Sequence, residues 1–360
     1  MTDRKISNFE FATLNYFLTR AFLIGITFNA LINALRHDSW IIPLVSIAPA
    51  LIIIFLLDYI MKYKSNLNLS EKIISLFNRK IGIVIIIILT IFIFFISLLN
   101  FLNMSNFIQS QFLSKTPLLA ICIMFMLTTF YIASKGINVI SRTSNILFYL
   151  GFVLLLLSFI GLIGAFKIEN LKPFFMSSIV SYSNGLNTFY AFNILPIFLL
   201  TMIPKDCLKS PNSRRTLIIS YIVSAISIFF VVFQTIATLG YELTKLYEYP
   251  EFFVLKHIVL INLSFRVESI LIIQLIFDMF IYNIISVYFI GNSIKSIFNT
   301  KKLNIIYFMV CTLITIGSLY ISKYSFYLDD LIANHITTII SVFITLIILI
   351  ICIKIKIDKY

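Results

Sequence analysis

The stretch that decides the fold is IGIVIIIILTIFIFFISLLNFLNMSNF, residues 81–107, which contains no charged side chain. An α-helix rises about 1.5 Å per residue, so about 20 apolar residues cross the hydrocarbon core of a bilayer. A strand of a membrane barrel needs only about 10 residues and alternates in polarity. This run is longer and does not alternate, and it therefore predicts a transmembrane helix.

Comparable apolar runs recur along the whole chain, separated by short polar or basic segments. They predict ten spans, at about residues 10–34, 40–61, 81–107, 116–134, 143–166, 185–203, 216–239, 267–294, 303–322 and 334–353. The sixth span is the weakest, because asparagines such as Asn187 and Asn193 interrupt it before Pro196.

The overall composition agrees with a protein surrounded by lipid. Of the 360 residues, 60% are hydrophobic and 12% are charged, and the mean hydropathy is +1.02. Soluble domains have about 25% charged residues. In lipid every backbone polar group must be paired within the protein, which favours helices. We therefore expect an all-α integral membrane protein, with residues 1–360 forming a single polytopic domain embedded in the lipid bilayer.

The positions of the basic residues predict the orientation. The net charge is +13, but the lysines and arginines cluster between the apolar runs, which argues against a nucleic-acid partner. With the N-terminus in the cytoplasm, 19 of the 28 basic residues fall on the inner side and 8 on the outer side. This bias follows the positive-inside rule. It predicts an even number of spans, a cell-membrane location and both termini in the cytoplasm.

The sequence gives no reason to expect an enzyme. It contains no P-loop, no HExxH or GxSxG motif and no pair of catalytic carboxylates. The four cysteines are scattered and form no CxxC motif. We therefore expect no catalytic residues, no cofactor and no metal site.

Two connections are longer than simple turns. Residues 62–80 are basic with spaced apolar positions, which predicts a short amphipathic helix at the inner leaflet. Residues 240–266 form the longest outer loop and contain an apolar stretch, residues 252–263, which predicts a helix lying over the outer face.

Several motifs in this order resemble the spore germination receptor B-subunit family, also called endospore germination permeases, of the amino acid–polyamine–organocation transporter superfamily. The motifs are Ile6-Ser7 at the N-terminus, Asp38-Ser39-Trp40-Ile41 before the second span, Lys135-Gly136-Ile137-Asn138-Val139-Ile140-Ser141-Arg142 between the fourth and fifth spans, and Tyr249-Pro250-Glu251 followed by Lys256-His257-Ile258 and Phe265-Arg266-Val267-Glu268-Ser269 before the eighth span.

The resemblance implies a LeuT-like transporter fold of about ten transmembrane helices in two inverted five-helix repeats, at about residues 10–166 and 185–353. Spans one and six would both be broken near the midplane, with the ligand between them. The family usually has a glycine-rich break in span one, where this chain has Ala21-Phe22-Leu23 with Gly25 as the nearest glycine. Span six has Tyr190-Ala191-Phe192-Asn193 in place of the usual Gly-Phe-Glu-like element.

Two charged residues fall near the centres of predicted spans, Arg20 in span one and Asp278 in span eight. A charge inside the membrane costs about 2.5–3.5 kcal/mol on insertion scales, so it suggests a function. Spans one and eight are neighbours in the implied fold. We therefore expect Arg20 and Asp278 to pair, with the guanidinium where sodium-coupled relatives bind an ion. The alternatives are a purely structural pair, or an Arg20 side chain that extends to the interface.

Polar side chains within the spans are the candidates for ligand binding. They are Thr19, Arg20, Asn100, Asn187, Tyr190, Asn193 and Gln274. Such residues line polar cavities, but amides also hold membrane helices together, with about 0.6 kcal/mol per hydrogen bond on average. Both roles remain open for each single residue.

The leading functional hypothesis is the membrane subunit of a nutrient receptor in the spore inner membrane. It would bind a small amino acid-like nutrient at mid-membrane and, with the A- and C-type receptor subunits, trigger germination. A stand-alone amino acid or cation permease would share the same fold, so fold alone cannot separate the two. A membrane subunit without a ligand is a third possibility.

Overall fold

The computed structural model describes residues 5–209, 212–257, 270, 272–324 and 337–358. Regular structure in these residues is helical throughout, apart from an isolated bridge between Ile6 and Leu208. Within the described residues, eight helical segments are long and apolar enough to cross a membrane. The first of them, Asn8–Lys62, contains two of the predicted spans, and the 17-residue helix Leu118–Ser134 is a further apolar segment.

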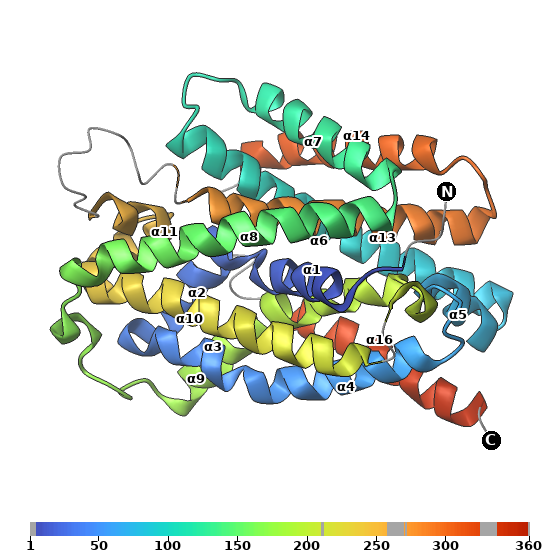
Figure 1. Cartoon of the computed structure of the whole chain (residues 1–360), viewed down its shortest axis with the longest axis horizontal. Helices are drawn as coiled ribbons and strands as arrows, with labels where there is room; N and C mark the ends of the chain where they lie inside the picture. Colours follow the sequence, from blue (N-terminus) through green and yellow to red (C-terminus); the bar gives the residue numbers. More distant parts are fainter. Residues whose placement is uncertain (1–4, 210–211, 258–269, 271, 325–336, 359–360) are drawn as a thin grey trace.

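The first five predicted spans correspond to a series of helices (Figure 1). These are α1 (Asn8–Arg20), η1 (Leu23–Thr27), α2 (Phe28–Leu35), η2 (Arg36–Ile41), α3 (Ile42–Val45), α4 (Ile47–Lys62), α6 (Arg79–Gln111), α7 (Leu118–Ser134), α8 (Ile137–Leu162) and η3 (Ile163–Ala165). The short helix α5 (Leu69–Leu76) lies between the second and third spans.

The second five spans follow after the 3-10 turn η4 (Ile168–Leu171). They comprise α9 (Ile179–Phe189), η5 (Tyr190–Ile194), η6 (Leu195–Met202), α10 (Ser213–Leu246), α13 (Ile273–Phe298), α14 (Leu303–Ile321) and α16 (Thr337–Asp358). The connections contain η7 (Lys205–Cys207), α11 (Pro250–Phe253), η8 (Val254–His257) and η9 (Ser322–Tyr324).

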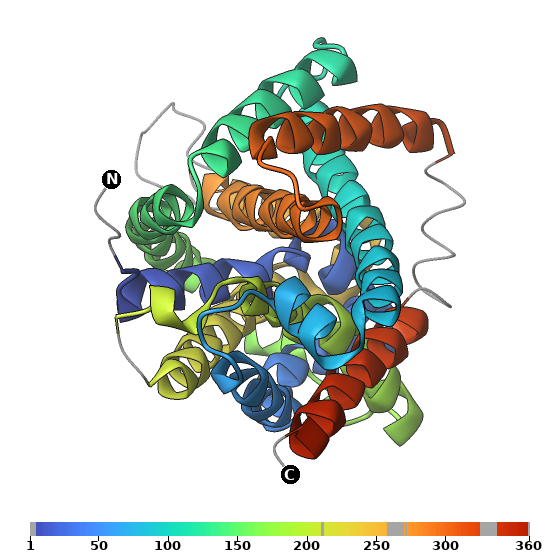
Figure 2. The same cartoon turned by 90° about the vertical axis from the view of Figure 1, so that its right-hand side faces the viewer.

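The helices form one elongated bundle around α1, which packs against α8, α10 and α13. Helices α7 and α14 pair at one edge of this bundle (Figure 2). The start of α1 and the end of α16 lie at the same end of the bundle as α5, and α11 lies at the opposite end (Figure 1). These are called the α5 end and the α11 end below.

Large apolar side chains cover the outward faces of the long helices. Ile91 of α6, Ile160 of α8 and Ile316 of α14 are each about two-thirds exposed. Soluble monomers rarely expose apolar patches this extensive. Lipid tails cover such surfaces in a membrane, so the chain is a multi-pass membrane protein.

The predicted amphipathic helix in residues 62–80 is α5, but its apolar face packs on protein. Leu69 and Ile73 are fully buried, and α5 contacts α6 and α16. Asn68 and Glu71 form a capping box at its N-terminus. The buried Lys72 donates hydrogen bonds to two carbonyls at the end of α4. Burial lowers the pKa of Lys72 to about 8.

The predicted helix over the outer face is present in part as α11 and η8. Phe252 packs against Phe107 of α6, with ring centroids 6.1 Å apart. Residues 258–263 of the predicted helix, and Arg266 and Glu268 of the motif, lie outside the described residues.

Candidate functional site

Span one opens between α1 and α2, at mid-bundle. Ile24 leaves the helical region with ψ 127°, and Gly25 has φ 70° and ψ −35°. Only glycine adopts a positive φ without steric strain. The family resemblance predicts the break at residues 21–23. The structure shows the non-helical torsions slightly later, where the glycine is.

Opening a helix in a membrane frees carbonyl groups that need new donors. Three asparagine side chains supply them. Asn193 donates to the Thr19 carbonyl over 2.8 Å, Asn100 to the Ala21 carbonyl over 2.9 Å, and Asn103 to the Ile24 carbonyl over 2.8 Å. Span one is therefore tied to span six and, at two points, to span three.

Asn193 joins the two halves of span one. Its Oδ1 atom accepts a hydrogen bond from the Thr27 hydroxyl over 2.9 Å, while its Nδ2 atom binds the Thr19 carbonyl. On the other side of the break, Asn283 of α13 donates to Asn100 Oδ1 over 3.0 Å. The opening is thus held by amides from three other spans.

A buried ion pair lies at the end of α1, directly before the break. Arg20 Nε is 3.0 Å from Asp278 Oδ2, and the two side chains are 1% and 2% exposed. Arg20 also donates to the Ser227 hydroxyl over 2.7 Å and lies over the Tyr16 ring, 5.0 Å from its centroid. The guanidinium is therefore surrounded by spans one, seven and eight.

Span six does not open in the same way. Helix α9 ends at Phe189 and continues as the π-turn η5 and the 3-10 helix η6, and all of these elements keep helical backbone torsions. Span six has no glycine between Tyr190 and Ile194. The Pro196 ring would clash with the carbonyl of residue 192 in a regular α-helix, and the wider π-turn relieves this clash. The expected break is therefore a change of helix type.

Aromatic rings fill the space between the two irregular spans. Phe22 packs against Phe192 with centroids 5.1 Å apart and against Tyr282 of α13 at 4.8 Å. These three side chains are at most 2% exposed. In this conformation the ligand position implied by the family resemblance is occupied by side chains.

The remaining predicted residues are not gathered at the break. The Thr19 hydroxyl donates within its own helix, to two carbonyls of the preceding turn. Gln274 is buried beside Gly151 of α8, and its Oε1 atom has no hydrogen-bond partner. Both Asn187 and Tyr190 face α16, where they bind threonine hydroxyls.

A buried carboxyl group covers the break from the α11 end. Glu251 of α11 is 2% exposed, and neither of its carboxyl oxygens has a hydrogen-bond partner. Burial raises its pKa to about 8, although the nearby backbone N–H groups of Glu251 and Gly25 act in the opposite direction. Tyr249 lies beside the same glycine, where an added Cβ would come within 3.0 Å of its ring. The sequence placed Glu251 only within a family motif and gave no indication of its burial.

Another buried carboxylate lies near the α5 end. Asp58 Oδ2 is 2.7 Å from Lys62 Nζ and 3.1 Å from Arg214 Nε, and Asp58 Oδ1 accepts a hydrogen bond from Ser213. The i,i+4 spacing of Asp58 and Lys62 could have indicated this pair. It joins span two to span seven and contacts no residue of the break.

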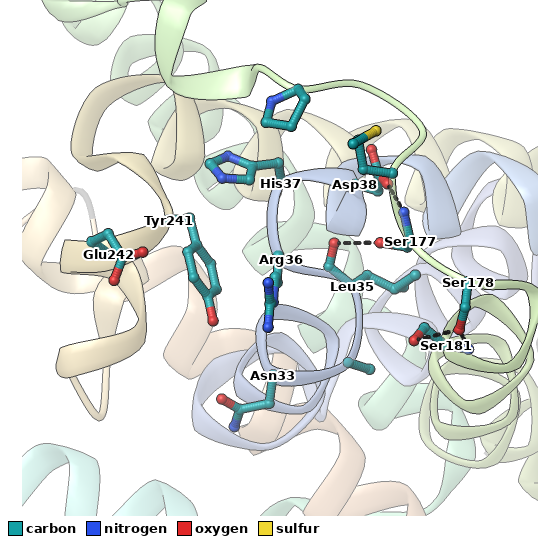
Figure 3. A pocket seen from close by; sticks show the side chains of 13 residues that line it. Asn33, Leu35, Arg36, His37, Asp38, Ser177, Ser178, Ser181, Tyr241 and Glu242 are labelled. Atoms are coloured by element: carbon teal, nitrogen blue, oxygen red, sulfur yellow. Dashed lines mark hydrogen bonds between the residues drawn. The ribbon is translucent and has the colours of Figure 1, made fainter.

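A cavity of about 620 Å³ opens at the α11 end of the bundle (Figure 3). The residues that line it come from the end of α2, from η2, from the segment before α9 and the first turn of α9, and from the end of α10. Its charged side chains include Arg36 and Glu242, and the ring of Tyr241 lies between them in the view of Figure 3. We call it the Arg36 cavity.

The wall of the Arg36 cavity is fixed by Asp38. Its carboxylate accepts hydrogen bonds from the backbone N–H groups of Phe175, over 2.7 Å, and Ser177, over 3.0 Å. The Ser177 hydroxyl donates to the Leu35 carbonyl over 2.9 Å, as the dashed line in Figure 3 shows. The family-like motif at Asp38 therefore joins the end of span one to the segment that leads into span six.

Arg36 has an unfavourable backbone conformation, with φ 50° and ψ −120°. Such torsions cost about 1–3 kcal/mol for a residue with a Cβ, and they persist only where the surroundings impose them. The Ser39 hydroxyl, which donates to the Arg36 carbonyl over 2.7 Å, helps to impose them here. In this conformation the Arg36 guanidinium lies over the ring of Tyr241, with Cζ 5.9 Å from the centroid.

Comparison of the sequence with models of protein families places this chain in a known family. The model of a family described as spore germination protein matches residues 9–326. The chain belongs to the spore germination protein family. No curated protein sequence matches this chain significantly.

Solved structures share the fold of this chain at low sequence identity. A Na⁺-coupled sialic acid symporter is 13% identical with a TM-score of 0.66, and the match covers 91% of this chain and 77% of the symporter. A mutant of the manganese transporter of Eremococcus coleocola is 12% identical with a TM-score of 0.66, and the match covers 97% of this chain and 78% of the transporter. The fold is therefore the LeuT-like fold of transporters.

Proposed function

We propose that this chain is the membrane subunit of a nutrient receptor, which binds a small amino acid-like nutrient between spans one, six and eight and thereby triggers spore germination. The observation that supports this most directly is the opening of span one at Gly25. An unwound segment can offer backbone N–H and C=O groups to a ligand. The nutrient would take the place of the packed rings of Phe22, Phe192 and Tyr282.

The ion pair next to the break suggests how the receptor differs from a sodium-coupled transporter. We propose that the Arg20 guanidinium supplies beside Asp278 the positive charge that an ion supplies in sodium-coupled relatives. Such a fixed cation would make nutrient binding independent of sodium. Because the pair connects spans one and eight, it would also hold α1 in place while α2 moves.

The orientation is part of the same proposal. The α5 end, with Lys62, Lys64 and Lys205, would face the cytoplasm together with both termini, and the α11 end would face the outside of the spore inner membrane. The germination receptor A- and C-type subunits would then receive the conformational change.

Ligand-induced stabilisation of the purified full-length chain tests the proposal. Anything that binds only the folded state raises the unfolding temperature. We expect at least one amino acid to raise it in potassium buffer without sodium, and Asn193→Leu to reduce this rise. The matched control is Asn304→Leu, at an exposed position at the start of α14. If no amino acid stabilises the chain, the proposed function is wrong.

The structural neighbours favour a second candidate function, a stand-alone permease, since the names of both solved relatives describe transport. Uptake of a labelled amino acid by proteoliposomes that contain only this chain would support the permease. Binding without uptake would support the receptor.

A further inference from the structure

We propose that the Arg36 cavity is a second binding site, for a small zwitterion such as a free amino acid, at the α11 end of the bundle. The proposal rests on the proposed function in one respect, because it takes the nutrient to be amino acid-like. The residues that support it are different from those at the span-one break.

The Arg36 cavity carries side-chain charges of both signs, as a site for a zwitterion requires. Arg36 and Glu242 both line it, and both side chains are exposed. Neither forms an ion pair with the other or with any other described residue. A guanidinium binds a carboxylate through two parallel hydrogen bonds, and a carboxylate accepts hydrogen bonds from an ammonium group. A free amino acid provides both partners in one molecule.

Two further polar side chains of the cavity, Asp38 and His37, are already engaged. Both oxygens of the Asp38 carboxylate accept backbone hydrogen bonds. His37 Nδ1 donates to the Asn170 carbonyl over 3.0 Å, which joins η2 to η4. Among the charged side chains that line the cavity, Arg36 and Glu242 therefore remain to pair with the charges of a ligand.

The cavity is also connected to the break in span one. It is lined by Asn33, Ala34 and Leu35 of α2, the helix that begins directly after the break. A ligand held between Arg36 and Glu242 would join the end of α2 to α10. Occupation of the cavity would then restrain the half of span one that has to move when the central rings separate.

Thermal stabilisation with single substitutions in the cavity tests the proposal. The probes are the individual free amino acids, and for each one that stabilises the wild-type chain, its N-acetyl and its carboxamide derivatives. We expect Arg36→Gln and Glu242→Gln each to weaken apparent affinity at least tenfold. The N-acetyl derivative lacks the ammonium group, so its affinity should not change in Glu242→Gln. The carboxamide lacks the carboxylate, so its affinity should not change in Arg36→Gln.

Matched controls at the same end of the bundle are Lys245→Gln and Glu169→Gln, which are exposed and do not line the cavity. If the two cavity variants respond to the amino acid like the wild type, the second site is wrong while the mid-membrane proposal stands. If no amino acid stabilises the wild-type chain, both proposals fail.

Discussion

Spans one and six occupy corresponding positions in the two halves of the sequence, yet only span one opens. At Gly25 it takes a positive φ, and the carbonyls of Thr19, Ala21 and Ile24 receive amide donors from other spans. Span six keeps helical torsions through a π-turn and a 3-10 helix. It therefore frees fewer backbone groups.

The difference shows what an opening in a membrane helix requires. A residue must tolerate the backbone torsions, and each exposed carbonyl must find a donor away from water. In span one, Gly25 tolerates the torsions, and three asparagine side chains from other spans supply the donors. In span six, one of these asparagines, Asn193, is used as a donor for span one. Span six, which stays helical, thus stabilises the opening in span one through this hydrogen bond.

The largest effect on this arrangement is expected from breaking the ion pair before the opening. Arg20→Met leaves a buried carboxylate without a partner, which costs about 3–5 kcal/mol. The double variant Arg20→Met with Asp278→Leu should recover most of this loss, because no unpaired charge remains. Thermal unfolding in detergent measures both.

Arg142→Met, at an exposed position of α8, is the control, and it should stay within about 0.5 kcal/mol of the wild type. If the double variant is as unstable as Arg20→Met alone, the loss does not come from the unpaired carboxylate.

A smaller effect is expected from removing the amide that joins the two spans. Asn193→Leu leaves the Thr19 carbonyl and the Thr27 hydroxyl without a partner, at a cost of about 1–3 kcal/mol in unfolding free energy. The control on the same span is Asn187→Leu. It removes only one long hydrogen bond, of 3.3 Å to Thr338, and should cost less than about 0.6 kcal/mol. Equal losses, measured by thermal unfolding, would contradict the distinct role assigned to Asn193.

The smallest effect is expected from the ionisation of Glu251, the residue of α11 that covers the opening in span one. Burial raises the pKa of Glu251 to about 8, from an ordinary value of 4.5, so the docked state of α11 favours the protonated carboxyl. The stabilisation is complete below pH 4.5 and is lost as the pH rises towards 8. We expect hydrogen exchange at Gly25 and Phe252, corrected for its intrinsic pH dependence, to rise at least tenfold over this range.

Glu251→Gln should remove this pH dependence, because the amide stays neutral. Glu248→Gln, at an exposed position of the same loop, should leave it unchanged. The same pH dependence in Glu251→Gln would show that another group titrates.

The spans could be predicted from the sequence because apolar run length determines them. Within the described residues, each of the ten predicted runs falls largely on helices, apart from the opening in span one and a few residues at helix ends and junctions. Arg20 and Asp278 could be proposed as partners because charges inside spans are rare. The roles of Asn103 and Glu251 could not be predicted. Asn103 acts through a single hydrogen bond to the Ile24 carbonyl. Glu251 is buried because the connection that contains α11 folds over the bundle. Neither contact follows from hydropathy or spacing.

Helix α10 bends at Gly240, which has φ 74° and ψ 166°, and the part before this kink, residues 213–239, rises roughly 40 Å at about 1.5 Å per residue. The hydrocarbon core of a bilayer is about 30 Å thick. The turns around the Gly240 kink, with Tyr241 and Glu242, can therefore stand among the lipid headgroups. Anionic headgroups would compete there with an amino acid for the Arg36 guanidinium, and occupation of the Arg36 cavity would then depend on the lipid composition of the membrane.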